Sequence, residues 1–307
     1  MKLILYLFFF CTCFVVAEAQ PVDSIIQRKS LVNTVTDLSS DKMNGRLTGT
    51  IDAYHSADYI RTAFYNYGLK EIAGFPHYFD SFAVTMQGNP TWGINVMGVV
   101  PAVAPTDTII IFSAHYDHLG EIANANSGED GIYNGANDNA SGVAALLELA
   151  NYYQTIHTNK YNCWFVAFSG EELGLLGSEH LAATINLKKV FAVVNMDMMG
   201  IPDANYEYKC AVFCKDDVKT VKKLNHYLQE TGGKKNFFVR NEYFSDLFSR
   251  SDQYSFAGKV KNCIMFSATS DQSYLYHTVK DQVETIDFDF LLNTTKNIAL
   301  ACRIFTE

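Results

Sequence analysis

The sequence has little proline and no excess of positive charge, and these two shortages exclude several classes of protein. Only 6 of the 307 residues are proline, whereas 48% are hydrophobic and 14% are aromatic. A chain of this composition can build a sizeable core, so extensive disorder is not expected. The 24 lysines and arginines are outnumbered by 33 acidic residues, which gives a net charge of −9. This charge argues against a nucleic-acid backbone as the binding partner.

Internal repeats, linkers and low-complexity runs are also absent from the sequence. The length of 307 residues fits one large α/β domain or two smaller ones. No shift in composition divides the chain, and we therefore expect a single domain from Gln20 to Glu307.

Long hydrophobic runs are missing after the first 20 residues, which read MKLILYLFFFCTCFVVAEAQ. This segment has a basic start at Lys2, an apolar stretch over residues 3–16, and small residues at Ala17 and Ala19. Such a layout is typical of a cleavable secretory signal peptide, and the apolar stretch is short for a bilayer span. We expect residues 1–19 to be removed, leaving a secreted or periplasmic protein without stable membrane insertion. Lipoprotein anchoring is the less favoured alternative, because bulky residues precede the two cysteines of this segment.

Cysteine is sparse in the remaining chain, which has five residues of this type. Because five is odd, at least one thiol is free unless it pairs between chains. No two cysteines have the spacing of a zinc ribbon. Cys210 and Cys214 can form a disulfide if the chain turns between them, but they lie too far apart if it is a strand.

Short apolar runs alternate with helical patterns along this part of the chain. Several of the runs lack polar alternation, as expected for strands buried on both faces. The runs are INVMGVV (94–100), TIIIFSA (108–114), NCWFVAF (162–168), FAVVNMD (191–197) and NCIMFSA (262–268). Helical spacing covers residues 49–69, 141–156 and 289–305. The alternation predicts a three-layer α/β/α fold with a central mixed, largely parallel sheet.

Acidic residues and histidines gather near the ends of these runs, where ligand sites form in such sheets. They are His115, Asp117, Asp138, Glu171, Glu172, Asp197 and, much later, His277. Each alone has an ordinary structural explanation, such as a buried histidine, a helix cap or a turn. Together they would repel one another and be poorly solvated without a counterion. A pair of divalent metal ions satisfies them, and mixed imidazole and carboxylate ligands favour zinc over manganese or cobalt.

The order of these motifs resembles a known family of enzymes. The motifs are HxD at 115–117, ND and SG at 137–142, GEE at 170–172, NMDM at 195–198 and YH at 276–277. Together they resemble the co-catalytic di-zinc aminopeptidases, secreted bacterial leucine-aminopeptidase-like zinc exopeptidases whose relatives include glutaminyl cyclases and glutamate carboxypeptidases. The upstream GRLTGTIDAYHSADYI and NVMGVV extend the likeness over most of the mature chain. The resemblance implies a zinc-exopeptidase fold of the phosphorylase/hydrolase-like type and two Zn²⁺ per chain.

The resemblance also implies two metal sites that share one carboxylate, that of Asp138. His115 and Asp197 complete one site, and Glu172 and His277 complete the other. In this family the shared aspartate is commonly followed by a cis peptide bond, which places one between residues 138 and 139.

Three further residues have implied roles in catalysis. Glu171 accepts the proton of the attacking water and passes it to the leaving amine. Asp117 accepts a hydrogen bond from His115 and fixes its tautomer, as carboxylates behind metal-binding histidines do. Tyr276 donates its phenol proton to the oxyanion of the tetrahedral intermediate.

Three other polar residues lie near these motifs or in a segment that resembles the family. His118 leads into a glycine turn, and we expect it to be peripheral. Asp252 is a candidate for contacting a substrate amine or for supporting a ligand. Gln253 stands where the family usually has a histidine.

The sequence therefore predicts a secreted zinc aminopeptidase that removes N-terminal residues from peptides with free N-termini, with an apolar first residue preferred. One alternative is a glutaminyl cyclase-like enzyme with a single zinc, although SGEELGLLGSEHL is more typical of the peptidases. Another is a carboxypeptidase relative, although no arginine cluster is evident and Arg240 and Arg250 are unplaced. A binding domain without catalysis is disfavoured, because no implied ligand is missing. Oligomeric state is not indicated.

Overall fold

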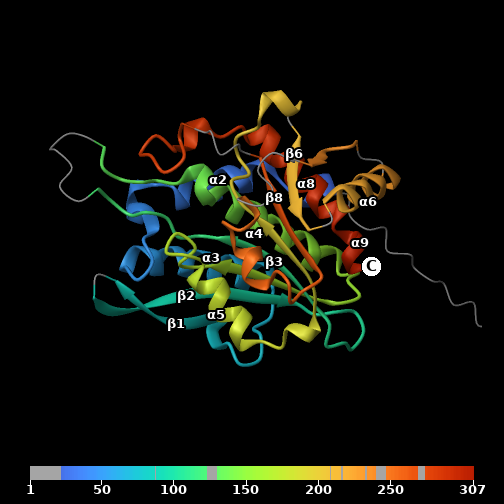
Figure 1. Cartoon of the computed structure of the whole chain (residues 1–307), viewed down its shortest axis with the longest axis horizontal. Coiled ribbons are helices and arrows are strands. Elements are labelled where there is room, and N and C mark those ends of the chain that lie inside the picture. The colour runs from blue at the N-terminus through green and yellow to red at the C-terminus, as the bar shows by residue number, and fades with distance from the viewer. Residues whose placement is uncertain are drawn as a thin grey trace, which may run out of the picture.

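Figure 1 shows a computed structural model of the chain. It describes residues 22–86, 88–122, 130–207, 209–215, 217–231, 234–239, 247–268 and 274–307. The signal peptide predicted for residues 1–19 lies outside this part, as does Arg240. Among the described residues, no helix combines the length and the apolar character needed to cross a bilayer.

Eight strands in the described residues form one sheet with the order β1-β2-β4-β3-β5-β8-β6-β7. The four central strands β4, β3, β5 and β8 are parallel to one another. β1 and β2 are antiparallel additions at one edge, and β6 pairs antiparallel with β8 at the other. The strand bounds are β1 Phe79–Met86, β2 Asn89–Val100, β3 Ile109–His115, β4 Asn162–Phe168, β5 Val190–Met196, β6 Cys210–Cys214, β7 Phe237–Val239 and β8 Asn262–Ser267. The predicted mixed, largely parallel sheet is confirmed.

The central strands are covered on both faces. Every residue of β3 is buried, which explains its apolar run without polar alternation. Ile110 and Phe112 belong to one hydrophobic cluster and Ile111 belongs to a second. Because successive side chains of a strand point to opposite faces, these two clusters are the two sides of the sheet.

The two helical layers differ in thickness. The thicker layer packs around α4, which is buried along most of its length and contacts α2, α3, α8 and the sheet. The thinner layer contains α5 and the 3₁₀ segment Asp252–Phe256, whose Leu181, Ala182 and Phe256 belong to the second cluster. The helix bounds are α1 Val22–Ile25, α2 Arg28–Leu38, α3 Ile51–Tyr67, α4 Gly142–Ile156, α5 Leu176–Thr184, α6 Asp217–Glu230, α8 Phe288–Ala301 and α9 Arg303–Thr306. The three-layer α/β/α architecture is therefore as predicted.

The cysteines of the described chain are all buried and none forms a disulfide. Cys210 and Cys214 lie at the two ends of strand β6. The extended backbone between them separates their side chains, which is the second of the two possibilities left open by the sequence.

Candidate metal centre

The predicted site residues converge at the carboxyl-terminal edge of the three neighbouring strands β4, β3 and β5. His115 is the last residue of β3, and Asp197 directly follows β5. Glu171 and Glu172 lie three and four residues beyond the end of β4 at Phe168. Because parallel strands end at the same edge of a sheet, these side chains meet although they lie far apart in the sequence.

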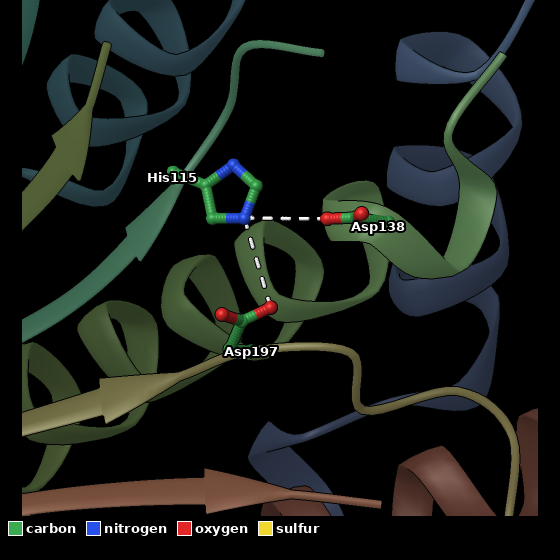
Figure 2. Close-up of side chains that lie close together, drawn as sticks. All are labelled: His115, Asp138 and Asp197. Atoms are coloured by element: carbon green, nitrogen blue, oxygen red, sulfur yellow. Dashed lines mark ion pairs between the residues drawn. The ribbon is translucent and has the colours of Figure 1, made fainter. Parts of the chain in front are cut away.

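The first cluster consists of His115, Asp138 and Asp197, which point toward one another in Figure 2. His115 Nε2 lies 3.3 Å from Asp138 Oδ1 and 3.6 Å from Asp197 Oδ1. The ligand atoms of the three side chains all lie within 4.8 Å of one another, and all three residues are buried. Two ligands of a tetrahedral zinc are about 3.3 Å apart when their bonds are about 2.0–2.1 Å long. The separations around His115 match this value.

The second cluster uses the other oxygen of Asp138. His277 Nε2 lies 3.3 Å from Asp138 Oδ2 and 3.0 Å from Glu172 Oε2. The two oxygens of Asp138 therefore face different histidines, as a shared ligand requires. The donor set of each cluster, one imidazole with two carboxylates, is one that zinc accepts. The described residues thus fit two zinc ions.

The buried carboxylates of this region attract positive charge. Burial disfavours a charge on His115, yet the nearby carboxylates, Glu171 foremost, raise the pKa of this histidine well above its usual value. The pKa of His277 rises to about 9 despite its burial, because the carboxylates of Asp138 and Glu172 lie close to its Nε2. The carboxylates thus attract positive charge to the spaces next to Nε2 of His115 and Nε2 of His277. Divalent cations bound there would supply this charge.

The loop that carries Asp138 is fixed to the end of β5. The peptide bond between Asp138 and Asn139 is cis, as the resemblance implied. The Asn139 side chain donates to the carbonyl of Met196 at 3.0 Å and accepts from the amide of Met198 at 3.0 Å. These two bonds span Asp197, so the loop and the first-cluster aspartate hold one another in place.

Asp117 contacts His115 differently from the prediction. His115 Nδ1 lies 3.2 Å from the main-chain carbonyl oxygen of Asp117, whereas the Asp117 carboxylate is 3.8 Å away. That carboxylate instead accepts hydrogen bonds from the Thr48 hydroxyl at 3.0 Å and the Glu171 amide at 3.2 Å. The tautomer of His115 is therefore set by a backbone carbonyl, and the carboxylate holds the turn that presents Glu171.

A pocket opens beside the first cluster. Its lining residues are His115, Asp138, Glu171, Asp197, Met198, Leu247, Arg250, Ser251, Met265, Ser267 and Tyr276. Glu171 lines this pocket, whereas Glu172 belongs to the second cluster. Burial and the neighbouring carboxylates, opposed by His115, raise the pKa of Glu171 well above its usual value. The two adjacent glutamates therefore face different surroundings.

Tyr276 lies on the pocket wall with its hydroxyl oriented by Arg250. Its ring stacks on the ring of His277 with a centroid distance of 3.7 Å. The Arg250 guanidinium donates to the Tyr276 hydroxyl oxygen at 2.9 Å and lies 5.5 Å from the ring centroid. Because the hydroxyl accepts from Arg250, its own proton is available for a substrate oxygen.

Asp252 and Gln253 lie beneath the pocket and not on its surface. Asp252 is fully buried, and burial, opposed by His115, raises its pKa to about 7. It does not line the pocket, so the candidate role of contacting a substrate amine is not supported. Gln253 donates to the carbonyl of Phe248 at 2.6 Å and accepts from Asn195 at 3.1 Å. Its hydrogen bonds are structural.

Two residues of the centre were not singled out from the sequence. The first is Asp281, which is buried four residues beyond His277. Its carboxylate accepts hydrogen bonds from the amides of Asn137 at 2.8 Å and Asp138 at 2.9 Å. Asp281 therefore ties the segment that carries His277 to the loop that carries Asp138.

The second is Arg46, whose side chain is fully buried and donates only to backbone carbonyls. Its acceptors are the carbonyl oxygens of Leu38, Tyr116, Asn134 and Gly135. Burial lowers its pKa to about 10, and surrounding carboxylates, Asp281 first, oppose this change. Arg46 thus joins the segment between His115 and Asp117 to the start of the Asp138 loop.

Replacing Arg46 with methionine is expected to lower the free energy of unfolding by about 3 kcal/mol or more, because several buried carbonyls lose a charged donor. Urea unfolding of the metal-free protein measures this change as a shift in midpoint at constant slope. Arg46→Lys is the matched control: it keeps the charge but not the planar fork, so it should recover only part of the loss. A loss under about 1 kcal/mol for the methionine variant would contradict this role.

Comparisons with known proteins identify the family of this chain. The model of peptidase family M28 matches residues 95–302. The alkaline phosphatase isozyme conversion protein of Escherichia coli is 33% identical over 174 residues, which are 53% of this chain and 49% of that protein. The chain thus matches about half the length of this curated relative.

Solved structures share the fold. BSAP, a zinc aminopeptidase from Bacillus subtilis, superposes with a TM-score of 0.70 at 16% identity, covering 92% of this chain and 96% of that one. Porphyromonas gingivalis glutaminyl cyclase gives 0.70 at 15% identity, covering 92% and 99%. The family match extends over most of the described sheet and includes the residues of both clusters. It confirms the family and the assignment to the peptidases: the chain belongs to peptidase family M28.

Proposed function

We propose that this protein is a secreted zinc aminopeptidase, a single domain from Gln20 to Glu307 that hydrolyses N-terminal residues from peptides. The observation that carries the proposal is the position of Asp138. Its two oxygens face two histidine and carboxylate clusters, and the pocket beside them is lined by Glu171 and Tyr276. This arrangement contains a shared metal ligand, a general base and a hydroxyl donor around one pocket.

Two zinc ions bound by these residues would supply Lewis acidity, which activates a water and polarises the scissile carbonyl. Glu171 lines the pocket without belonging to either cluster, so its carboxylate is free to accept the proton of the attacking water. The same carboxyl group then returns this proton to the leaving amine. Tyr276, oriented by Arg250, donates its hydroxyl proton in a hydrogen bond to the oxygen that becomes negative.

The selection of a free N-terminus follows from the acidity of the pocket. Glu171, Asp138 and Asp197 all line it. Together with Asp117 and Glu172, they carry more negative charge than two zinc ions balance. This excess attracts a protonated α-amine, which fixes the scissile bond one residue from the end of the peptide. Met198, Leu247 and Met265, which also line the pocket, suit an apolar first side chain.

Two alternatives make different use of the same scaffold. A single-zinc cyclase needs only one cluster, whereas both clusters here retain their ligands. A carboxypeptidase needs a cation for the C-terminal carboxylate, and Arg250 is an exposed guanidinium on the pocket wall. Arg250 is already bonded to Tyr276, which favours its role as a positioning partner of the phenol.

Comparing a leucyl chromogenic amide with its N-acetylated form tests the proposal. Acetylation removes the charge and the lone pair of the amine, so kcat/KM should fall by about 10²-fold or more, the effect of losing a charged hydrogen bond. Metal analysis of the same sample should give close to two zinc ions per chain. Equal rates on the two amides would exclude the aminopeptidase assignment, and full activity with one zinc would favour the cyclase-like alternative.

A further inference from the structure

His118 was expected to be peripheral, and this prediction is wrong. Its side chain is completely buried, and its Nδ1 lies 2.7 Å from Glu172 Oε1. The ring packs edge-on against His277 with a centroid distance of 5.7 Å. The turn after Asp117 therefore directs this histidine into the second cluster and not toward solvent.

The position of the His118 ring is fixed by its surroundings. Gly135 has a φ of +56°, and a Cβ there would lie 2.6 Å from His118 Cδ2 and 2.3 Å from the carbonyl oxygen of Asp138. Only glycine allows the ring to approach the backbone so closely. The main-chain amide of His118 is 3.4 Å from the carbonyl of Arg46. Arg46 in turn donates to the carbonyl of Gly135, so the same residue holds both His118 and the start of the Asp138 loop.

The hydrogen bond to Glu172 has one possible direction when the glutamate is ionised. A carboxylate only accepts, so Nδ1 of His118 must be the donor. Nε2 of His118 has no hydrogen-bond partner among the described residues. The contact with Glu172 is thus the side-chain hydrogen bond that orients this ring.

His118, Asp138 and Glu172 lie close enough to form a metal-binding group, so the individual distances must separate a hydrogen-bond donor from a metal ligand. Ligand atoms on one tetrahedral zinc lie about 3.3 Å apart, as estimated from bonds of about 2.0–2.1 Å. His277 Nε2 fits this spacing, at 3.3 Å from Asp138 Oδ2 and 3.0 Å from Glu172 Oε2. His118 Nδ1 does not, since it lies 2.7 Å from Glu172 Oε1 and 4.0 Å from Asp138 Oδ2.

We propose that His118 is a positioning residue for the second metal ion. Its Nδ1–H holds Oε1 of Glu172 and thereby turns Oε2 toward the point shared with His277 Nε2 and Asp138 Oδ2. The inference rests on the two-metal centre of the proposed function. It assigns to Glu172 the kind of outer support that the Asp117 carbonyl gives to His115.

Three variants at this position separate the donor from the ring. His118→Asn places an amide N–H close to where Nδ1 stands, because both groups branch from Cγ. His118→Gln moves the amide outward toward the position of Nε2, and His118→Leu keeps volume without a donor. If the hydrogen bond from Nδ1–H positions Glu172, the asparagine variant keeps this hydrogen bond, whereas the glutamine and leucine variants lose it.

Zinc binding to the metal-free protein, measured by competition with a chromogenic chelator, gives the affinity of each ion without any substrate. His118→Leu and His118→Gln should bind the second ion about 10–100-fold more weakly, the usual effect of losing an outer hydrogen bond. The first ion should be unaffected. His118→Asn should bind both ions nearly as the unmodified protein does.

Three results would overturn the inference. Unchanged affinity for the second ion in both the leucine and glutamine variants would remove any role for Nδ1–H. Equal loss in all three variants would make His118 a ligand, since an asparagine amide binds zinc poorly. A starting protein that binds only one ion would remove the second site itself. By contrast, a protein that binds two ions but cleaves no peptide would contradict the proposed function alone.

Discussion

Replacing Glu171 with glutamine is expected to lower kcat by about 10³–10⁴-fold while both zinc ions stay bound. Glutamine matches glutamate in size, but its neutral amide is too weak a base to accept a proton from water near neutral pH. The substitution therefore removes only the general base. Glu171 lines the pocket and belongs to neither cluster, which is why the metal centre should survive the change. Steady-state kinetics on a leucyl chromogenic amide, with zinc determined on the same sample, measure both effects.

Glu172→Gln is the matched control, because it makes the same chemical change one residue away. Glu172 Oε2 lies 3.0 Å from His277 Nε2, so this variant should lose affinity for the second ion. Added zinc should restore part of its activity, whereas it should do nothing for Glu171→Gln. Equal turnover and full metal content in both variants would show that the two roles are assigned wrongly.

The central strands could be predicted because their surroundings leave a plain signal. The predicted strand runs became β2, β3, β4, β5 and β8, of which the last four form the parallel centre of the sheet. Strands covered on both faces need apolar residues at every position, so their runs are uninterrupted. The position of the metal centre could be predicted for the same reason, because side chains just beyond the ends of parallel strands gather at one edge of the sheet.

The edges of the sheet were harder to predict. In β1 the side chains of Asp80, Phe82 and Val84 are buried and alternate with more exposed ones. Such alternation predicts a strand, but one of the buried positions is the aspartate Asp80, so the apolar residues alone do not show the full period. β7 spans only Phe237–Val239, too few residues for any periodicity.

The positioning residues of the centre escaped prediction for a different reason. Arg46 and Asp281 bond to backbone atoms, which every residue has, so no partner side chain signals the contact. His118 bonds to Glu172 across 54 positions of sequence. The resemblance named residues that perform chemistry, whereas these three hold other residues in place. Their roles emerge only when the chain is folded.

The second large effect is expected for Asp138→Ala, which should abolish binding of both ions and reduce peptide hydrolysis to background. Asp138 Oδ1 faces His115 and Oδ2 faces His277, so the substitution removes a ligand from each cluster at once. Asp197→Ala is the control, because Asp197 belongs to the first cluster alone. This variant should keep one ion.

Thermal unfolding with and without zinc measures this difference independently of activity. At free zinc about 100 times the dissociation constant, each ion stabilises the folded state by about 2.7 kcal/mol. At roughly 2 °C per kcal/mol for a chain of this size, two ions should raise Tm by about 10 °C and one ion by about half of that. Zinc should therefore shift the unmodified protein most, Asp197→Ala about half as much, and Asp138→Ala not at all. If Asp138→Ala retained an ion and half the shift, Glu172 and His277 would bind that ion unaided, and Asp138 would serve only the first cluster.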